Sequence, residues 1–416
     1  MKERTRAIIA VIVIVTLVAV LSFIFLPRTL TVPSVFYPTI QAAIDSARAG
    51  DTVFVKKGVY NESLTIDKPL SLIGEERQNT IIVIPYQRYA PPVIQVSANN
   101  VTISGFTLEG IGRQVGIWIE TFGSNPQPSG CKIIGNKIVN NTSGIHSFGG
   151  DNLLISGNYI TENSEYGIYH SSSESEISGN RIESNGWAGI IVDGCSDVTI
   201  SQNRIEGNGL DETGPPEDRG GLLLRWNGPF YVYGNNISHN QVFGIEFGEG
   251  CYDTRVFENY ILRNKVGINL LNFIIEGDAS VGLGNVVCRN NLIDNPQQAF
   301  VEKAYRYAEN LENWTFTNAT DIVAWNNSGE GNFWSDYSGI DANNDELGDT
   351  AYVIDENNSD YYPLIKPIAI PELPDAIDKI EPFPTLLVVA VIVTVVAVIA
   401  VSLLVYHKKR KSEVRS

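Results

Sequence analysis

A short phrase, in which an asparagine stands two positions before an apolar residue, recurs through the middle of the chain. The asparagines of its seven occurrences are Asn136, Asn158, Asn180, Asn203, Asn235, Asn259 and Asn290. They are spaced by 22, 22, 23, 32, 24 and 31 residues, and a second phrase, Gly-Ile or Gly-Leu, keeps step with the first. Such a period is typical of repeat architectures, in which each unit buries its apolar face only against its neighbours.

Each unit contains short apolar–polar alternations, such as VTISQNRI and LLISGNYI, separated by Gly, Asn or Ser. Alternation with a period of two predicts strands, whereas a leucine-rich or helical repeat would need a longer helical pattern. A β-propeller would need about 40 residues for each blade. Coils stacked about 4.8 Å apart would pair every strand with the next coil. The sequence therefore predicts an all-β, single-stranded parallel β-helix over residues 37–325.

The ends of such a stack must be covered, because they expose apolar coil and unpaired strand edges. TIQAAIDSARAGD predicts a capping helix whose apolar face holds Ile40, Ala43, Ile44 and Ala47, with Gly50 as its C-cap. We expect residues 27–36 to be a linker. Residues 326–366 lack the repeat and are expected to form the other cap, and the proline-rich residues 367–384 to form an extended spacer.

Two long apolar stretches flank this region and predict transmembrane helices over residues 7–26 and 385–406. Basic residues in the tails 1–6 and 407–416 indicate that both ends are cytoplasmic and that the domain between them is extracellular or periplasmic. A cleaved signal peptide is the alternative for the first stretch, although it is long for one and lacks an A-x-A site.

The amino-acid composition limits the classes of partner that the chain can bind. The chain has 47 acidic and 30 basic residues, a net charge of −17, which excludes a generic nucleic-acid-binding surface. Cys195 and Cys251 share a repeat phase but lie two coils apart, beyond disulfide reach, and are expected to be buried thiols. Sequons that permit glycosylation, or that arise by chance in an Asn-rich region, occur at Asn61, Asn100, Asn140, Asn141, Asn236, Asn313, Asn318, Asn326 and Asn357.

The opening phrase YPTIQAAIDSARAGDTVFVKKGVYNESLTIDKPLSLIG, the Asn-x-Ile coils and the closing phrase GNFWSDYSGIDANNDELGDTAYVIDENNSDYYPL resemble the NosD-type β-helix family. This family belongs to the larger group of carbohydrate-binding and sugar-hydrolase β-helices with pectate-lyase-like folds. The resemblance covers residues 37–366 and implies a right-handed, exported β-helix, often tethered to a membrane in archaeal examples. The family name carries a role in copper delivery, which belongs to a few members, and fold analogy does not transfer chemistry.

An acidic loop in the predicted C-terminal cap alternates oxygen-bearing residues. Its possible ligands, at loop positions 1, 3, 5, 7 and 9, are Asp341, Asn343, Asp345, the carbonyl of Leu347, and Asp349. The loop resembles the start of calcium loops in EF-hands, dockerins and thrombospondin repeats, but Glu346 stands where Gly is usual and Tyr352 where a bidentate acid is usual. We expect a structural Ca²⁺ here, with a metal-free Asx-rich turn as the alternative.

The residues that follow the Gly-Ile phrases should point outward if each Ile points inward. The first outward column is Trp118, His146, Tyr169, Ile191, Leu223, Glu246 and Asn269, and the second is Glu120, Phe148, Ser171, Asp193, Arg225, Gly248 and Leu271. Aromatic rings beside acids suit sugars, so the candidate ligand-binding residues are Trp118, Glu120, His146 and Tyr169. The alternative is an ordinary strand surface.

A catalytic interpretation needs two carboxylates about 5–10 Å apart. Asp193 and Glu246, two coils apart and hence about 10 Å, are candidates together with Arg225, although stacked coils place many acid pairs at this distance. The extra residues from Leu210 to Gly220 must leave the coil as a loop, which we expect to be a solvated acidic excursion.

Copper binding needs soft or imidazole ligands gathered together, and His146, His170 and His239 fall at different repeat phases while Met1 is the only methionine. We therefore expect a membrane-anchored β-helix that binds glycans or other cell-envelope components without catalysis. A polysaccharide lyase or glycoside hydrolase is the alternative, and a NosD-like copper-delivery accessory is the second alternative.

Overall fold

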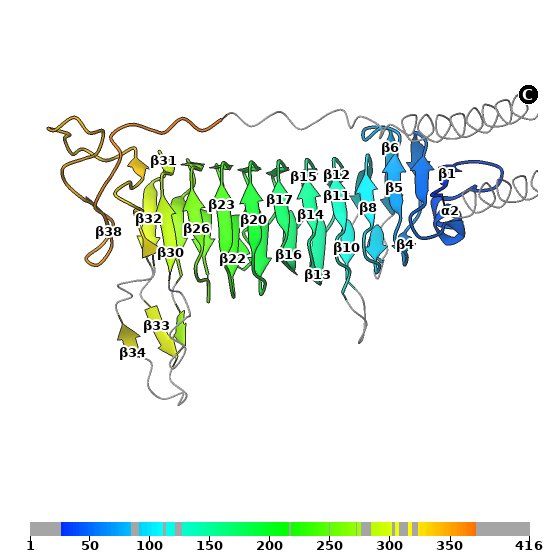
Figure 1. The fold of residues 1–416 in the computed structure, drawn as a ribbon, viewed down its shortest axis with the longest axis horizontal. Helices are drawn as coiled ribbons and strands as arrows, with labels where there is room; N and C mark the ends of the chain where they lie inside the picture. Colours follow the sequence, from blue (N-terminus) through cyan, green and yellow to red (C-terminus); the bar gives the residue numbers. More distant parts are fainter. Residues whose placement is uncertain are drawn as a thin grey trace, which may run out of the picture. The chain divides into compact units, whose positions relative to one another are not determined.

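The computed structural model describes residues 26–371, apart from 85–90, 111–113, 121–126, 216–217, 249, 272, 276–283, 302–303, 308–314 and 318–322. Within it, successive coils of the chain stack into a parallel β-helix with strands on three faces (Figure 1). The fold prediction is confirmed in this respect. The first coil already contains a strand at residues 29–32, inside the segment expected to be a linker.

Three parallel sheets, here named A, B and C, run along the stack. Sheet A consists of β1 (Thr29–Val32), β2 (Thr52–Val55), β5 (Ser71–Gly74), β8 (Thr102–Ser104), β11 (Lys132–Ile134), β14 (Leu154–Ser156), β17 (Glu176–Ser178), β20 (Val198–Ser201), β23 (Phe230–Tyr233), β26 (Arg255–Phe257), β30 (Asn285–Cys288) and β35 (Val323–Ala324). Sheet B consists of β3 (Gly58–Tyr60), β6 (Thr80–Ile84), β9 (Thr107–Gly110), β12 (Lys137–Val139), β15 (Tyr159–Thr161), β18 (Arg181–Glu183), β21 (Arg204–Glu206), β24 (Asn236–Ser238), β27 (Tyr260–Leu262), β31 (Asn291–Ile293) and β36 (Phe333–Trp334). Sheet C consists of β4 (Leu64–Ile66), β7 (Ile94–Val96), β10 (Ile117–Ile119), β13 (Ile145–Asp151), β16 (Ile168–Ser173), β19 (Ala188–Asp193), β22 (Gly220–Arg225), β25 (Phe243–Phe247), β28 (Val266–Leu270) and β32 (Gln297–Val301).

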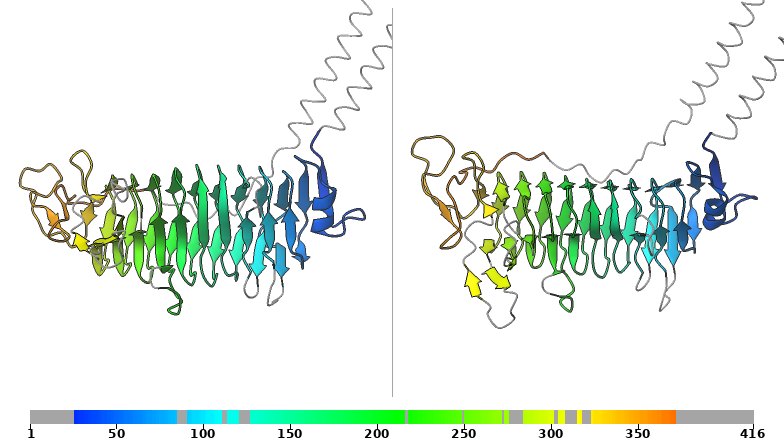
Figure 2. Two further views of the ribbon diagram at one scale, coloured as in Figure 1. Left: turned by 90° about the horizontal axis from the view of Figure 1, so that it is seen from below. Right: turned by 60° about the horizontal axis from the view of Figure 1, so that its bottom comes forward.

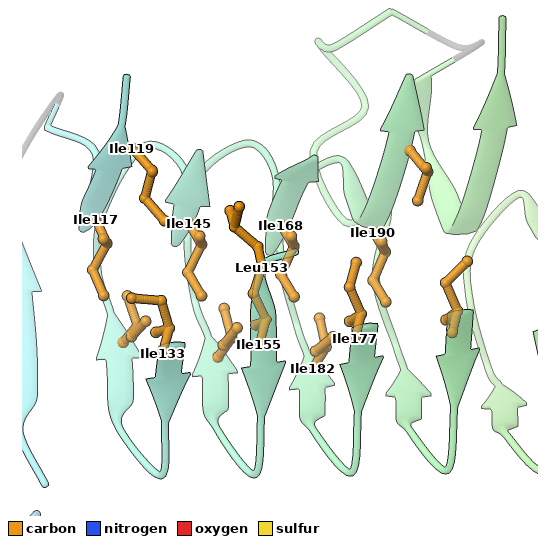
Figure 3. Close-up of a cluster of buried hydrophobic side chains, with 14 of the residues drawn as sticks. Ile117, Ile119, Ile133, Ile145, Leu153, Ile155, Ile168, Ile177, Ile182 and Ile190 are labelled. Atoms are coloured by element: carbon orange, nitrogen blue, oxygen red, sulfur yellow. The ribbon is translucent and has the colours of Figure 1, made fainter. Parts of the chain in front are cut away.

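The interior is filled by columns of branched aliphatic side chains, one from each coil. On sheet B, Ile138, Ile160 and Ile182 are in register and fully buried. Figure 3 shows the same arrangement on the other two faces, with Ile117, Ile145, Ile168 and Ile190 on sheet C near Ile133, Ile155 and Ile177 on sheet A. β-branched residues suit this role because they fit a pleated surface with little loss of rotamer freedom.

The asparagines of the repeat phrase form a ladder inside the stack, as predicted. Its members are Asn136, Asn158, Asn180, Asn203, Asn235, Asn259, Asn290 and Asn332. Asn158 Nδ2 donates to Asn180 Oδ1 at 3.0 Å and to the carbonyl of Ile133 at 2.8 Å, and the backbone N–H of Asn158 donates to the same Oδ1 at 2.9 Å. Each buried amide is therefore satisfied by the next coil and by the preceding turn.

A second asparagine ladder lies five residues further along each coil and was not predicted. Its members are Asn141, Asn163, Asn185, Asn208, Asn240, Asn264 and Asn295. The side chain of Asn141 is buried in this ladder, so the sequon at that position does not offer an accessible glycosylation site.

The residue before each ladder asparagine, apart from Asn332 at the end of the first ladder, adopts a left-handed backbone conformation. Gly135, Gly157 and Gly179, with φ of 64°, 63° and 62°, precede the first ladder, whereas Asn140, Glu162 and Ser184, with φ of 58°, 56° and 58°, precede the second. A left-handed residue turns the chain sharply, and the asparagine then bonds the turn to the next coil. Both ladders thus stabilise corners between sheets.

The N-terminal end is covered by α2 (Ile40–Ser46), which buries Ile40, Ala43 and Ile44 against the first coils. The Thr39 hydroxyl accepts a hydrogen bond from the N–H of Ala42, and the Glu62 carboxylate accepts from the N–H groups of Ile40 and Gln41. The capping helix is confirmed, but its expected C-cap is wrong, because the helix ends at Ala47. Gly50 instead takes the left-handed position, φ 86°, of a turn in which Asp51 accepts a hydrogen bond from the N–H of Arg48.

At the far end, residues 326–366 first continue the stack through Asn332 and β36 of sheet B and then close the first ladder. The Asp360 carboxylate accepts from the N–H of Asn332 at 2.7 Å and from Trp334 Nε1 at 2.9 Å. Burial raises the pKa of Asp360. The remaining described strands are the hairpin β37 (Tyr352–Val353) and β38 (Ser359–Asp360), and a small sheet of β29 (Phe273–Ile275), β33 (Ala304–Tyr307) and β34 (Thr315–Thr317).

The two predicted transmembrane segments lie outside the described residues, except for Leu26. Among the residues that are described, no helix has the length and apolar character needed to cross a membrane.

Candidate functional site

A row of aromatic side chains lies on the outward face of sheet C. Trp118 of β10, His146 of β13 and Tyr169 of β16 are in register on consecutive coils, which confirms the predicted outward column. Their ring centroids are 4.8 Å and 4.6 Å apart, and Phe148 lies 4.6 Å from His146. All four residues are partly exposed, so the row is partly accessible from outside.

The row continues through two residues that the sequence analysis did not single out. The ring of Tyr166 lies 5.6 Å from that of Tyr169 and 5.2 Å from that of Trp187. Both residues precede strands of sheet C and stand one or two residues before the Gly of the Gly-Ile phrase. An aromatic residue just before this phrase is therefore the sequence feature that could have identified them. We call Trp118, His146, Phe148, Tyr166, Tyr169 and Trp187 the aromatic row.

A charged cluster begins where the aromatic row ends. Arg225, at the end of β22, donates to Asp218 at 2.6 Å and lies 3.4 Å from a carboxylate oxygen of Glu246. The second oxygen of Glu246 accepts from Asn269 Nδ2 at 2.9 Å. Glu246 is only 2% exposed, so its charge is held by these polar neighbours rather than by water.

Two tyrosines join the row to the cluster. Tyr169 Oη donates to Asp193 at 2.7 Å, and Tyr166 Oη donates to Asp218 at 2.7 Å. Asp193 is paired in register with Arg225 on the next coil. The structure therefore brings together the three catalytic candidates, Asp193, Arg225 and Glu246, within one polar network on one face.

The loop between β21 and β22 covers part of this face, and Figure 2 shows it leaving the stack as a green excursion. Ile191 and Leu223 belong to the outward column but are fully buried, in a cluster with Ala188 and Phe243. Gly214 of the loop approaches the Trp187 indole so closely that a Cβ would lie 2.1 Å from Nε1. The expected solvated excursion is found at Leu210, Glu212 and Thr213, which are exposed, whereas Gly214 and Asp218 contact side chains of the sheet C face.

Burial and hydrogen bonds shift the pKa values of several groups in this network. Burial, together with the hydrogen bonds to Asp193 and Asp218, raises the pKa of Tyr169 and of Tyr166 well above that of a free phenol. Burial opposes the charged form of Arg225, but its contacts with Asp218 and Glu246 raise its pKa above the ordinary value. Burial lowers the pKa of His146 to about 4, so this side chain is neutral at pH 7.

Glu120, the fourth ligand-binding candidate, accepts a hydrogen bond from Trp118 Nε1 at 2.6 Å. This contact fixes the orientation of the indole at the start of the aromatic row. Trp118, Glu120, His146 and Tyr169 therefore lie together on one surface.

The sequence offers two sets of possible metal ligands: the predicted calcium loop, and the histidines and cysteines. In the predicted calcium loop, the Asp341 carboxylate accepts from the N–H groups of Asp345 and Glu346, and Asp349 accepts from that of Ala342. Glu346 has φ 69°, so it takes the left-handed conformation that Gly usually provides in such loops. Among the described residues, no three His, Cys, Asp or Glu side chains are grouped in a way that could hold a metal ion.

The donor set does not fit a copper site. His170 points into the stack and contacts Ser147 and the carbonyl of Ser172, whereas His146 points outward from the same sheet. The cysteines Cys131, Cys195, Cys251 and Cys288 are unpaired and buried, as was predicted for Cys195 and Cys251. Burial raises the pKa of Cys195 and of Cys251 to about 12, which disfavours the thiolate that a metal requires.

Comparison with known proteins supports the fold and the family resemblance. Residues 116–273 match the family described as "right handed beta helix region", and residues 216–339 match the family described as "periplasmic copper-binding protein (NosD)". The probable ABC transporter binding protein NosD of Stutzerimonas stutzeri is 28% identical over 185 residues, 44% of this chain and 32% of that protein. The protein YwoF of Bacillus subtilis (strain 168) is 23% identical over 348 residues, 61% of this chain and 74% of that protein.

The chain thus spans about a third of the length of that NosD relative. Among solved structures, pectate lyase Pel9A matches with a TM-score of 0.52 at 14% identity, covering 67% of this chain and 78% of that one. This likeness concerns the fold alone. The chain is a right-handed parallel β-helix protein related in sequence to the NosD family.

Proposed function

We propose that the outward face of sheet C, from the aromatic row to the charged cluster, binds a glycan of the cell envelope without catalysing a reaction. The observation that carries this proposal is the continuous contact of partly exposed rings over consecutive coils. Apolar ring faces pack on the C–H faces of sugars, and the carboxylates at the end of the row offer acceptors for hydroxyl groups.

Binding is favoured over catalysis because the charged groups are already engaged. A glycosidase needs one protonated and one free carboxyl group. Here Asp218 and Glu246 are both engaged by the Arg225 guanidinium, at 2.6 Å and 3.4 Å. Arg225, whose pKa is raised, does not accept a proton from a sugar, so it does not suit the role of a lyase base.

A location of the β-helix outside the cytoplasmic membrane is supported by the basic tails and apolar flanks of the sequence and by the description of the related family as periplasmic. A copper-delivery role is not proposed, since residues 216–339 contain His239 as their one histidine and no methionine.

The test is glycan retention by the full-length chain, purified in detergent, on an array that includes neutral and acidic envelope polysaccharides. Trp118→Ala should weaken binding about tenfold, the equivalent of roughly 1.4 kcal/mol for one aromatic contact. Tyr233→Ala is the matched control, because Tyr233 stacks on Phe257 at 5.1 Å on sheet A, away from the row.

Retention of no glycan, or equal loss in both variants, would refute the binding role. Release of unsaturated or reducing ends by the wild type, abolished by Glu246→Gln, would instead establish the lyase or hydrolase alternative.

A further inference from the structure

The loop between β1 and α2 presents two large apolar side chains to solvent. Val35 is 96% exposed and Phe36 is 84% exposed, which makes them the two most exposed large apolar residues in the described part of the chain. Exposed apolar side chains are common singly, but two adjacent ones at the tip of a projecting loop indicate a contact with another apolar phase.

The loop is ordered around this tip. The N–H of Ser34 donates to the carbonyl of Tyr37 at 2.9 Å, and the N–H of Tyr37 donates to the Ser34 hydroxyl at 3.1 Å. The Tyr37 ring packs against the core. The fold therefore holds Val35 and Phe36 outward, and their exposure does not result from a frayed end.

The tip lies at the end of the stack where the chain enters it, and Figure 2 shows the blue loop projecting beyond β1. Val32 pairs with Val55, so the loop starts beside the exposed Lys56 and Lys57 of the next coil, of which Lys57 is ion-paired with Glu76. The predicted transmembrane segment ends at Leu26, only a few residues before β1 in the sequence. The apolar tip and Lys56 thus lie at the end of the solenoid that directly follows this segment in the chain.

We propose that this loop inserts Val35 and Phe36 into the interfacial region of a lipid bilayer and seats the N-terminal end of the solenoid on the membrane. Apolar side chains gain from burial at the boundary between headgroups and acyl chains, and lysines are attracted to anionic headgroups. The glycan-binding face lies on sheet C further along the stack, so the two surfaces can act at once and are tested separately.

The experiment uses the full-length chain reconstituted in phosphatidylglycerol-containing vesicles. Val35→Cys is labelled with an environment-sensitive fluorophore, and a fraction of the lipid carries a nitroxide quencher. The four native cysteines are buried, so labelling is selective for the new thiol. Val353→Cys, at a site that is 67% exposed in the C-terminal cap, is the matched control.

The label at residue 35 should emit at shorter wavelength and lose most of its fluorescence to the lipid quencher, while the label at residue 353 should show neither change. Phe36→Ser in the Val35→Cys background should reduce the quenching without changing the melting temperature. Equal quenching at both sites would overturn the proposal. A label at residue 35 that is shielded from water but not quenched by lipid would also overturn it, because a protein partner would then cover the tip.

Discussion

Each ladder asparagine carries out three tasks with one short side chain. Asn158 accepts two donors from Asn136, donates to Asn180 on the next coil and donates to the Ile133 carbonyl on the preceding coil. An aspartate could accept but not donate, and a leucine could do neither. The repeat phrase therefore has asparagine at this position because the side chain must both accept and donate hydrogen bonds. Burial makes this requirement strong, since water cannot replace a missing partner.

Asn158→Ala should destabilise the protein by about 2 kcal/mol, because it leaves the backbone N–H of Asn136 buried without an acceptor and leaves its Nδ2 group with the Ile103 carbonyl alone. Urea unfolding followed by circular dichroism measures the change. Asn357→Ala, at an exposed position in the C-terminal cap, is the control and should shift the midpoint little. Equal midpoints for the two variants would show that the ladder contributes nothing net.

At the scale of elements, the sequence predicts the strands and the first asparagine ladder but not the second ladder or the contacts of the loop after β21. The first ladder was predictable because glycine occupies most of its left-handed turn positions. In the second ladder these positions hold residues such as Asn140, Glu162 and Ser184, which do not signal a left-handed turn in the sequence. Strand identity and the inward or outward direction followed from period-two alternation on the coils. The sequence analysis missed the contact of Gly214, in the loop after β21, with Trp187, because no local pattern encodes a contact between these segments.

The same limit applies to the candidate site. Register alone predicted that Trp118, His146 and Tyr169 share a column. Register could not predict that Asp218 of the loop reaches both Tyr166 and Arg225, since this depends on how the loop folds back.

The acidic loop of the C-terminal cap remains predicted to hold calcium, and this prediction belongs to the loop as an element. Saturating Ca²⁺ should raise the melting temperature relative to excess chelator, since a ligand at about 100 times its dissociation constant adds about 2.7 kcal/mol of stability. Asp341→Ala should abolish the difference, and Glu356→Ala, at an exposed position nearby, should retain it. A melting temperature that chelator leaves unchanged in the wild type would favour the metal-free Asx turn.

At the scale of the whole molecule, each coil is stabilised mainly by its contacts with the preceding and following coils. Each strand pairs only with the equivalent strands of the preceding and following coils, so the stack behaves as a nearly one-dimensional array whose ends open most easily. Asp360 terminates the first ladder by accepting from Asn332 and Trp334. The buried carboxylate of Asp360 is thus one of several contacts that bond the cap to the last coils, together with the backbone bond from Leu364 to Asn332 and the pair of bonds between Asn291 and Ile368.

Asp360→Leu should open the stack from this end, because each donor left without an acceptor costs about 1–3 kcal/mol. Hydrogen–deuterium exchange should accelerate in β36 and β31 first and leave β8 and β11 nearly unchanged, since contacts between coils are local. Asp360→Asn, whose amide oxygen can still accept, should preserve slow exchange throughout. A uniform increase along all coils would mean that the solenoid unfolds as one cooperative unit and that the carboxylate does not act as a local lock.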